Sequence, residues 1–514
     1  MKPIKKKKQQ EPLFVAGQDW TFDLLNKAWI EIERIANRDL KQTWYRPQIE
    51  VISSEQMIDA YASTGLPIMY KHWSFGKEFL RNDKAYKEGQ MGLAYEIVIN
   101  SSPCIAYLME ENNMLMQTLV MAHASIGHSA VFKNNMMFKQ FTDASAIVDY
   151  LLFAKNYIVN CEEKYGIDEV ESFLDSCHAL MDYGVDRYTV RRHISVKEEE
   201  RRANARLEED EKNFDPIWNK VVPKKAEKLK EDDDKWPKER EDNILYFIEK
   251  YAPDLPSWKR ELIRIVRKIS QYFYPQAITK VLNEGYATFT HYYIMNKLYE
   301  EGFIDAGSMI EFYKSHSGVT YQPEFDKKYF SGMNPYALGF AIFMDIKRIC
   351  EDPTDEDREW FPQLIGKNWV DAINDAMMNY KDDTFIAQFL SPKVIRDFKF
   401  FRVTDDTEDS FVEISSIHDS SGYQAIRTSL SNSYNRANWV PDIQVDEVDI
   451  LGDRALYLAH EPYLGRVLNP QLAEETLAHL ANLWEFDVVL ETLEPDNDGM
   501  VEITYVAMGT KNHG

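Results

Sequence analysis

Apolar residues recur at intervals of three and four along most of residues 13–395, and this period predicts helices that each bury one face. The pattern is clearest in 20–35, 143–166 and 244–302. Good helix starts support it: Asp19 precedes the first run, and Ser257 precedes another. We therefore expect a mainly α N-terminal domain over residues 13–395.

The pattern changes from residue 396 onward. Short runs with alternating or β-branched residues predict strands, and two amphipathic stretches between them predict helices. The predicted strands are 398–406, 410–417, 455–461, 487–494 and 500–508, and the predicted helices are 421–435 and 470–485. We expect a small C-terminal α+β module over 396–514, with antiparallel strands and helices packed on one face.

Two segments do not fit a core. Residues 1–12 are basic and polar, which is typical of a mobile tail. Residues 193–242 are almost entirely charged, with both signs mixed, and this predicts a solvated insertion within the helical domain. The segment that follows returns to the helical pattern.

Composition excludes several classes of function. The net charge of −24 disfavours sequence-independent binding to nucleic acid, because phosphates are bound by Lys and Arg. The sequence has no apolar run of membrane-spanning length, and no hydrophobic segment follows the basic N-terminus as it would in a secretory signal. Four widely spaced cysteines fit a reducing compartment, so we expect a cytoplasmic protein.

Candidate chemistry concentrates in residues 92–135. An apolar helix over 115–121 ends in two histidines, His123 and His128, on either side of Gly127. Glu96, Glu110 and Glu111 lie upstream and are candidate catalytic carboxylates. Imidazoles with carboxylates nearby suit a divalent metal, and zinc in particular. The same residues would also suit a satisfied polar cluster inside a large core.

Two later helices add candidates. Glu284 and His291 are seven residues apart and therefore lie on one helix face, in a segment otherwise rich in Tyr, Phe, Ile and Met. Buried polar groups need partners, and His123 and His128 are the obvious ones. His178 follows Asp175 by three residues, a spacing used by carboxylate-bridged metal sites and also common by chance.

Several long motifs resemble the SpoVR family (stage V sporulation protein R-like proteins). They are QIEVISSEQMIDAYASTGLPIMYKHWSFGK, GLAYEIVINSSPCIAYLMEEN, MAHASIGHSAVFKNN, DASAIVDYLLFAKNYI, DSCHALMDYGVDRY and NEGYATFTHYYIMNKLYEEG. The resemblance implies a bacterial cytoplasmic protein linked to spore cortex assembly or to stress physiology. It also implies a PrkA-type serine kinase and a von Willebrand A-like protein as partners.

A shorter motif resembles a segment of the gluzincin metallopeptidases. This resemblance implies a metallopeptidase-like helical core. Residues 283–287, NEGYA, are similar to their NExxA segment, which implies Glu284 as a metal ligand beside His123 and His128. The chain departs from the family's HExxH motif, since Ala124 stands where the general base would be. Five residues along an α-helix turn through about 500°, which leaves the two histidines about 140° apart. The helix must therefore bulge or break near Gly127.

Two hypotheses follow. The first is a zincin-like, metal-dependent hydrolase whose ligands are His123, His128 and Glu284, with His291 as a fourth ligand or its support and His178 a weaker candidate. The second is a non-catalytic scaffold or regulator that acts with the kinase and the von Willebrand A-like protein, in which the same residues form a polar network. A di-iron oxidase is a third alternative, with ligands from Glu96, Glu111, Asp175, His178 and Glu284.

Overall fold

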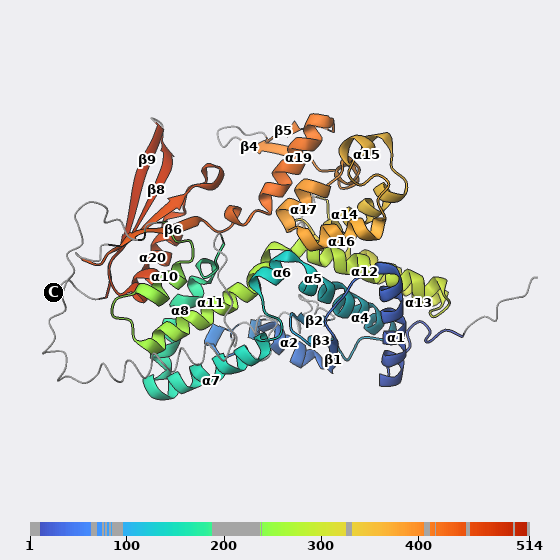
Figure 1. Cartoon of the computed structure of the whole chain (residues 1–514), viewed down its shortest axis with the longest axis horizontal. Coiled ribbons are helices and arrows are strands. Elements are labelled where there is room, and N and C mark those ends of the chain that lie inside the picture. Colours follow the sequence, from blue (N-terminus) through green and yellow to red (C-terminus); the bar gives the residue numbers. More distant parts are fainter. Residues whose placement is uncertain are drawn as a thin grey trace, which may run out of the picture. The chain divides into compact units, whose positions relative to one another are not determined.

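The computed structural model describes most of the chain. The described residues are 11–62, 69–74, 77, 80, 81, 84, 96–187, 237, 239–324, 332–405, 412–416, 418–448, 453–496 and 499–510. Most of the predicted charged insertion 193–242 and residues 1–10 of the predicted tail lie outside these ranges. The mainly helical fold with a C-terminal α+β region is confirmed (Figure 1).

The chain divides into two compact units, each assembled from separate segments. The first comprises Met1–Pro67, Ser74–Ser145 and Pro275–Asn435, and the second comprises Ile68–Trp73, Ala146–Tyr274 and Arg436–Gly514. The α+β sequence pattern that begins at residue 396 thus contributes to both units.

The first unit is built around helix α12 (Lys280–Glu300), whose residues are buried on almost every side (Figure 1). The other elements of this unit are α1 (Phe22–Ile35), η1 (Ala36–Leu40), β1 (Pro47–Ile52), α2 (Ser54–Ala62), β2 (Glu96–Ile99), β3 (Cys104–Met109), α4 (Met114–Met121), η2 (Ala122–His128), α5 (Ser129–Asn134), α6 (Met136–Phe141), α13 (Ala306–Val319), α14 (Pro335–Glu351), α15 (Asp355–Trp360), α16 (Trp369–Asn379), α17 (Asp382–Phe389), α18 (Pro392–Asp397), β4 (Arg402–Asp405), β5 (Val412–Ser416) and α19 (Ser420–Ser433). α12 contacts α1, α4, η2, α13, α14, α16 and α17. Burial on several sides explains why its buried residues are spread around the helix and do not form a single face.

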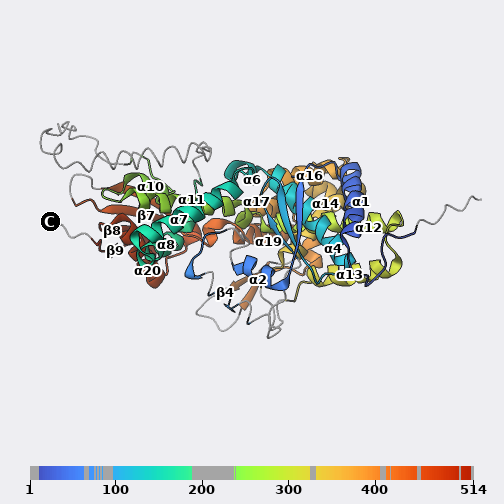
Figure 2. The same cartoon turned by 90° about the horizontal axis from the view of Figure 1, so that it is seen from below.

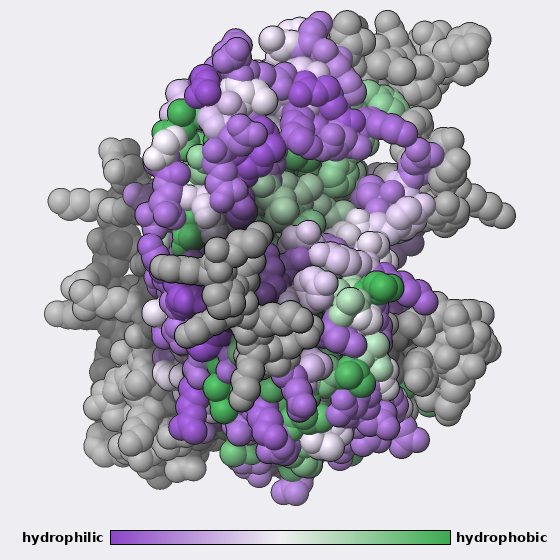
Figure 3. All heavy atoms as spheres, turned by 90° about the vertical axis from the view of Figure 1, so that its right-hand side faces the viewer, coloured by the Kyte–Doolittle hydropathy of each residue, from purple (hydrophilic) through white to green (hydrophobic). Residues whose placement is uncertain are grey.

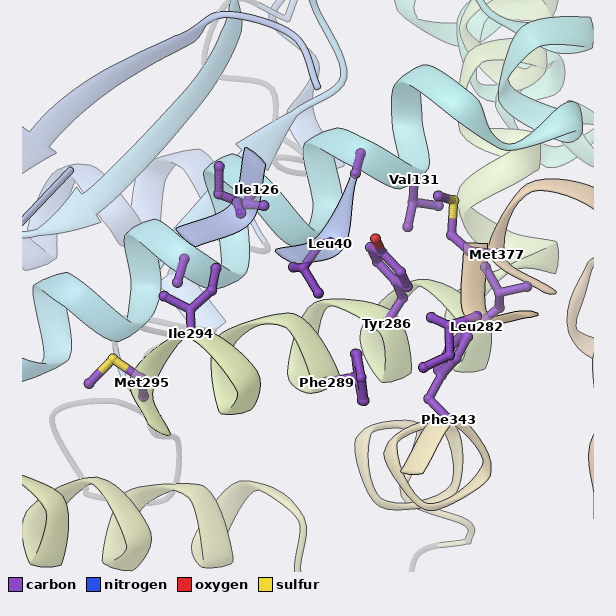
Figure 4. Packing of buried hydrophobic residues seen from close by; sticks show 14 of the residues in the cluster. Leu40, Ile126, Val131, Leu282, Tyr286, Phe289, Ile294, Met295, Phe343 and Met377 are labelled. Atoms are coloured by element: carbon purple, nitrogen blue, oxygen red, sulfur yellow. The ribbon is translucent and has the colours of Figure 1, made fainter. Parts of the chain in front are cut away.

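Large side chains fill the space around α12. Leu282, Tyr286 and Phe289 are at most 2% exposed, and the Tyr286 ring meets Phe343 of α14 edge-on with centroids 5.6 Å apart. Figure 4 shows these residues between α12 and the neighbouring helices. Such close packing fixes the position of α12 and therefore of any polar residue on it.

A three-stranded sheet, which the hydrophobic pattern did not reveal, lies against α4 and η2 (Figure 2). Its order is β1-β3-β2, with β1 parallel and β2 antiparallel to β3. β1 and β3 have six residues each, and β2 has four. Apolar runs this short cannot be distinguished from pieces of a buried helix by period alone, which explains the omission.

The second unit combines helices with a mixed sheet. Its elements are α7 (Ile147–Tyr165), α8 (Ile167–Ala179), η3 (Met181–Tyr183), α10 (Ile244–Tyr251), most of α11 (Ser257–Ile278), η5 (Arg436–Asn438), β6 (Asp442–Val448), β7 (Leu456–Glu461), η6 (Tyr463–Gly465), α20 (Pro470–Trp484), β8 (Val488–Asp496) and β9 (Gly499–Ala507). The sheet order is β6-β7-β8-β9. The strand β6, which the sequence pattern did not predict, pairs antiparallel with β7. The expected antiparallel pairing holds for β8–β9 but is wrong for β7–β8, which are parallel because the helix α20 connects them as a crossover.

Figure 3 shows a face of the molecule, on the side of α1 and α13, where hydrophilic residues predominate and hydrophobic ones form small separate areas. Single apolar side chains are exposed on both helices, for example Phe22 and Ile310. Scattered residues of this kind are normal on protein surfaces, so we assign no partner to them. Among the described residues, no helix combines the length and the apolar character needed to cross a membrane.

Candidate metal centre

A π-helical segment brings His123 and His128 together. The continuous helix from α4 to α5 changes to π-helix over η2, Ala122–His128, and Ser129 N–H donates to the carbonyl of Ala124, five residues earlier. Residues five apart in a π-helix occupy the positions that residues four apart occupy in an α-helix. The predicted bulge near Gly127 is therefore confirmed, and the two imidazole rings lie with centroids 4.6 Å apart.

Glu284 of α12 faces both histidines. Its Oε2 lies 3.4 Å from Nε2 of His128 and 3.6 Å from Nε2 of His123. The helices can approach this closely because Gly127 has no side chain: a Cβ built there would lie 2.6 Å from Cα of Ala287. A second close contact, between Gly285 and Gly339 of α14, holds the opposite side of α12.

Glu96 reaches the same point from the sheet. It is the first residue of β2, and its Oε1 lies 3.3 Å from Nε2 of His123. Potential ligand atoms of Glu96, His123 and His128 all lie within 4.8 Å of one another. The side chains of Glu96 and Glu284 keep 16% and 18% of their exposure, whereas the Oε2 atom of each is buried.

The outer nitrogens of both imidazoles are engaged elsewhere. His128 Nδ1 lies 2.9 Å from Oδ1 of Asn283, which can only accept, so this nitrogen carries the proton. His123 Nδ1 lies 2.9 Å from Nδ1 of His291. If Nδ1 carries the only proton of each ring, Nε2 of both rings becomes available to a metal ion on the side of the carboxylates, as in metal-ligating histidines.

The two carboxylates have opposite electrostatic surroundings. Burial raises the pKa of Glu96, and its histidine neighbours offset this only in part. Burial would also raise the pKa of Glu284, but His128 and His123 outweigh it and hold this pKa well below the usual range. In turn burial would lower the pKa of His128, but the Glu284 carboxylate raises it to about 9. Glu284 is thus held as an anion, while Glu96 is closer to accepting a proton.

The residues fit a divalent metal. Within the described part of the chain, Oε2 of Glu284 and Oε2 of Glu96 are buried and accept no hydrogen bond, a costly state for a carboxylate. Ligands about 2.1 Å from a tetrahedral zinc ion are about 3.4 Å from each other. The separations of 3.4 and 3.6 Å between Oε2 of Glu284 and the two Nε2 atoms match this value. One ion would satisfy both imidazole lone pairs and the unpaired oxygen of Glu284.

Comparison with known proteins identifies the family of this chain. The profile of the family described as SpoVR like protein matches residues 19–439, and that of the SpoVR-like C-terminal domain matches residues 441–495. The chain belongs to the SpoVR family. This SpoVR-family chain is 53% identical over 487 residues to the "Uncharacterized protein YcgB" of Escherichia coli (strain K12), which covers 95% of both sequences. No solved structure is matched.

Of the remaining predicted site residues of this SpoVR-family chain, His291 lies beside the centre, and Glu110, Glu111 and His178 lie elsewhere. Glu110 and Glu111 are exposed in the turn after β3, and Trp20 Nε1 donates only to the Glu110 backbone carbonyl. His178 belongs to the second unit, where it contacts Tyr70 and His72. His291 contacts Nδ1 of His123 through its own Nδ1, 2.9 Å away, so in a metal site it would support His123 instead of binding the ion directly.

Two polar residues of this centre were missed by sequence reasoning. Asn283 precedes Glu284 and pairs with His128, and the NExxA motif already contained it. His316 pairs with His291 and lies in the last turn of α13. The helix α13 continues through this histidine to Val319. A buried histidine inside a Ser- and Gly-rich stretch gave no sequence signal.

Proposed function

We propose that this SpoVR-family chain is a metal-dependent hydrolase with zinc as its natural metal. His123, His128 and Glu284 would hold the ion, and Glu96 would be the general base. The observation that carries the proposal is the convergence of both Nε2 atoms on Oε2 of Glu284, which accepts no hydrogen bond, at separations expected between ligands of one ion.

Each residue has a distinct role in this proposal. Bound zinc would act as a Lewis acid and lower the pKa of a coordinated water. Glu96 takes the proton from the attacking water and passes it to the leaving group, so that the water's O–H bond and the substrate's scissile bond are both broken. A carboxylate of raised pKa beside one of lowered pKa is the usual arrangement for dividing base and ligand roles.

Glu96 would also replace the general base that the HExxH pattern supplies and this chain lacks. In the gluzincin-like pattern the base would stand at position 124, which is alanine here. The strand β2 delivers a carboxylate to Nε2 of His123 from another direction. The chain therefore has a candidate base although its helix carries none.

We further propose an amide bond of a cell-wall peptide as the substrate class. Support comes from the link between SpoVR-like proteins and spore cortex assembly and from the similarity of residues 283–287 to a peptidase motif.

Two carboxylate-to-amide variants test these roles. Metal content of purified protein is measured by mass spectrometry, and affinity by competition with a chelator. We expect about one zinc per wild-type chain, a loss of affinity of at least roughly 100-fold in Glu284→Gln, and near-normal affinity in Glu96→Gln. Hydrolysis of peptidoglycan fragments should fall by about 10²–10⁴-fold in Glu96→Gln.

Other outcomes point elsewhere. Loss of metal in both variants would make Glu96 a ligand and remove it as the base. A metal-free wild-type chain would favour the scaffold hypothesis, which binding measurements with a PrkA-type kinase and a von Willebrand A-like protein would then test.

A further inference from the structure

A row of three imidazoles extends from the proposed metal centre. His123 Nδ1 lies 2.9 Å from Nδ1 of His291, and His291 Nε2 lies 3.1 Å from Nδ1 of His316. All three rings are buried, with exposures of 4%, 2% and 7%. They come from η2, α12 and α13, so the row depends on tertiary packing and not on local sequence.

Such a row permits only two arrangements of its protons when the rings are neutral, because each hydrogen bond needs one N–H and one lone pair. In the first, His123 donates from Nδ1 to His291, and His291 donates from Nε2 to His316. In the second, every bond is reversed, and the proton of His123 is on Nε2. Only the first arrangement leaves Nε2 of His123 free to bind a metal ion.

Surroundings keep the outer two rings neutral. Both rings are buried, and burial disfavours the charged form of an imidazole. Around His316 the rings of Phe312, Tyr292 and Phe340 lie with centroids 5.6, 5.0 and 4.8 Å away. In the first arrangement, Nδ1 of His316 is the acceptor for the N–H of His291 Nε2, 3.1 Å away.

We propose that His316 is a positioning residue of the metal centre. It accepts from His291, which fixes the tautomer of His291 and, through it, that of His123. This inference rests on the proposed metal site and assigns a function to a residue with no direct contact to the ion. Asn283 performs the same task for His128 in one step.

Two substitutions of His316 separate this role from simple packing. His316→Asn retains an acceptor near the position of Nδ1, whereas His316→Leu fills the aromatic pocket but cannot accept. The affinity of the full-length chain for zinc, and the visible spectrum after loading with Co²⁺, are measured for both variants. The thermal midpoint of the metal-free proteins shows whether either substitution disturbs folding.

We expect zinc affinity to fall by about 10–100-fold in His316→Leu and to stay within about threefold of wild type in His316→Asn. The Co²⁺ spectrum should change only in the leucine variant. Equal affinities in all three proteins, or equal losses in both variants at unchanged thermal midpoints, would overturn the role of His316 while leaving the metal site intact. A wild-type chain that binds neither metal would overturn both proposals.

Discussion

The contact between Gly127 and Ala287 provides a quantitative test of how the centre is held together. A Cβ at residue 127 would lie 2.6 Å from Cα and 2.8 Å from Cβ of Ala287, whereas ordinary contact begins at 3.4 Å. In Gly127→Ala, η2 and α12 must therefore separate by about 0.8 Å, the difference between 3.4 and 2.6.

Overpacking of this kind costs about 1–3 kcal/mol, and contact with backbone atoms, which cannot rotate away, places it near the upper end. Replacing glycine by alanine inside a helix recovers about 1 kcal/mol. We expect a net loss of about 2 kcal/mol in the free energy of unfolding, measured with urea and circular dichroism. Zinc affinity should fall at the same time, because a site must hold its ligands to within about 0.5 Å.

Gly318→Ala is the matched control. Gly318 lies inside α13, and a Cβ there would meet nothing within 4 Å. This variant should be as stable as wild type or more stable by up to about 1 kcal/mol. If Gly127→Ala were as stable as Gly318→Ala and bound zinc normally, the close helix contact would not be what positions the histidines.

Two further outcomes concern the same helix. In metal-free protein, the pKa of His128 is raised to about 9 by its pairing with Glu284. This pairing therefore stabilises the folded chain by its full amount below pH 6.5, the pKa of an unfolded histidine, and its contribution is lost as the pH rises through 9. The loss should be about 3 kcal/mol in thermal or urea unfolding with a chelator present, and Glu284→Gln should abolish this pH dependence. Asp382 accepts from the N–H groups of Val281 and Leu282 at 3.0 and 2.9 Å and so caps α12. Asp382→Ala should cost about 2 kcal/mol in urea unfolding and Asp382→Asn about half as much, and equal stability of both with wild type would contradict the capping role.

The hydrophobic period and one spacing argument predicted much of this molecule. Long amphipathic helices such as α1, α7 and α20 were recognisable because each buries one face, and the strands of the C-terminal region alternate. The five-residue spacing of His123 and His128 predicted the distorted helix, because a regular α-helix would have separated the rings.

What sequence reasoning could not supply was the ranking of partners that meet only in the folded chain. Glu96, Glu110 and Glu111 were equivalent candidates until the short strand β2 placed Glu96 beside His123. His316 reaches His291 only because α13 packs on α12. Such contacts depend on how the elements pack, which local pattern does not encode.

The separate segments of the first unit also determine when its centre can form during protein synthesis. Glu96, His123 and His128 leave the ribosome early, but the whole run Ala146–Tyr274 of the second unit must be translated before Glu284 emerges. A nascent chain that ends before α12 therefore has only part of the ligand set. In the proposed metal site, the ligand set with Glu284 is complete only after α12 has been synthesised, so that complete set could not serve as the template on which the N-terminal elements first fold.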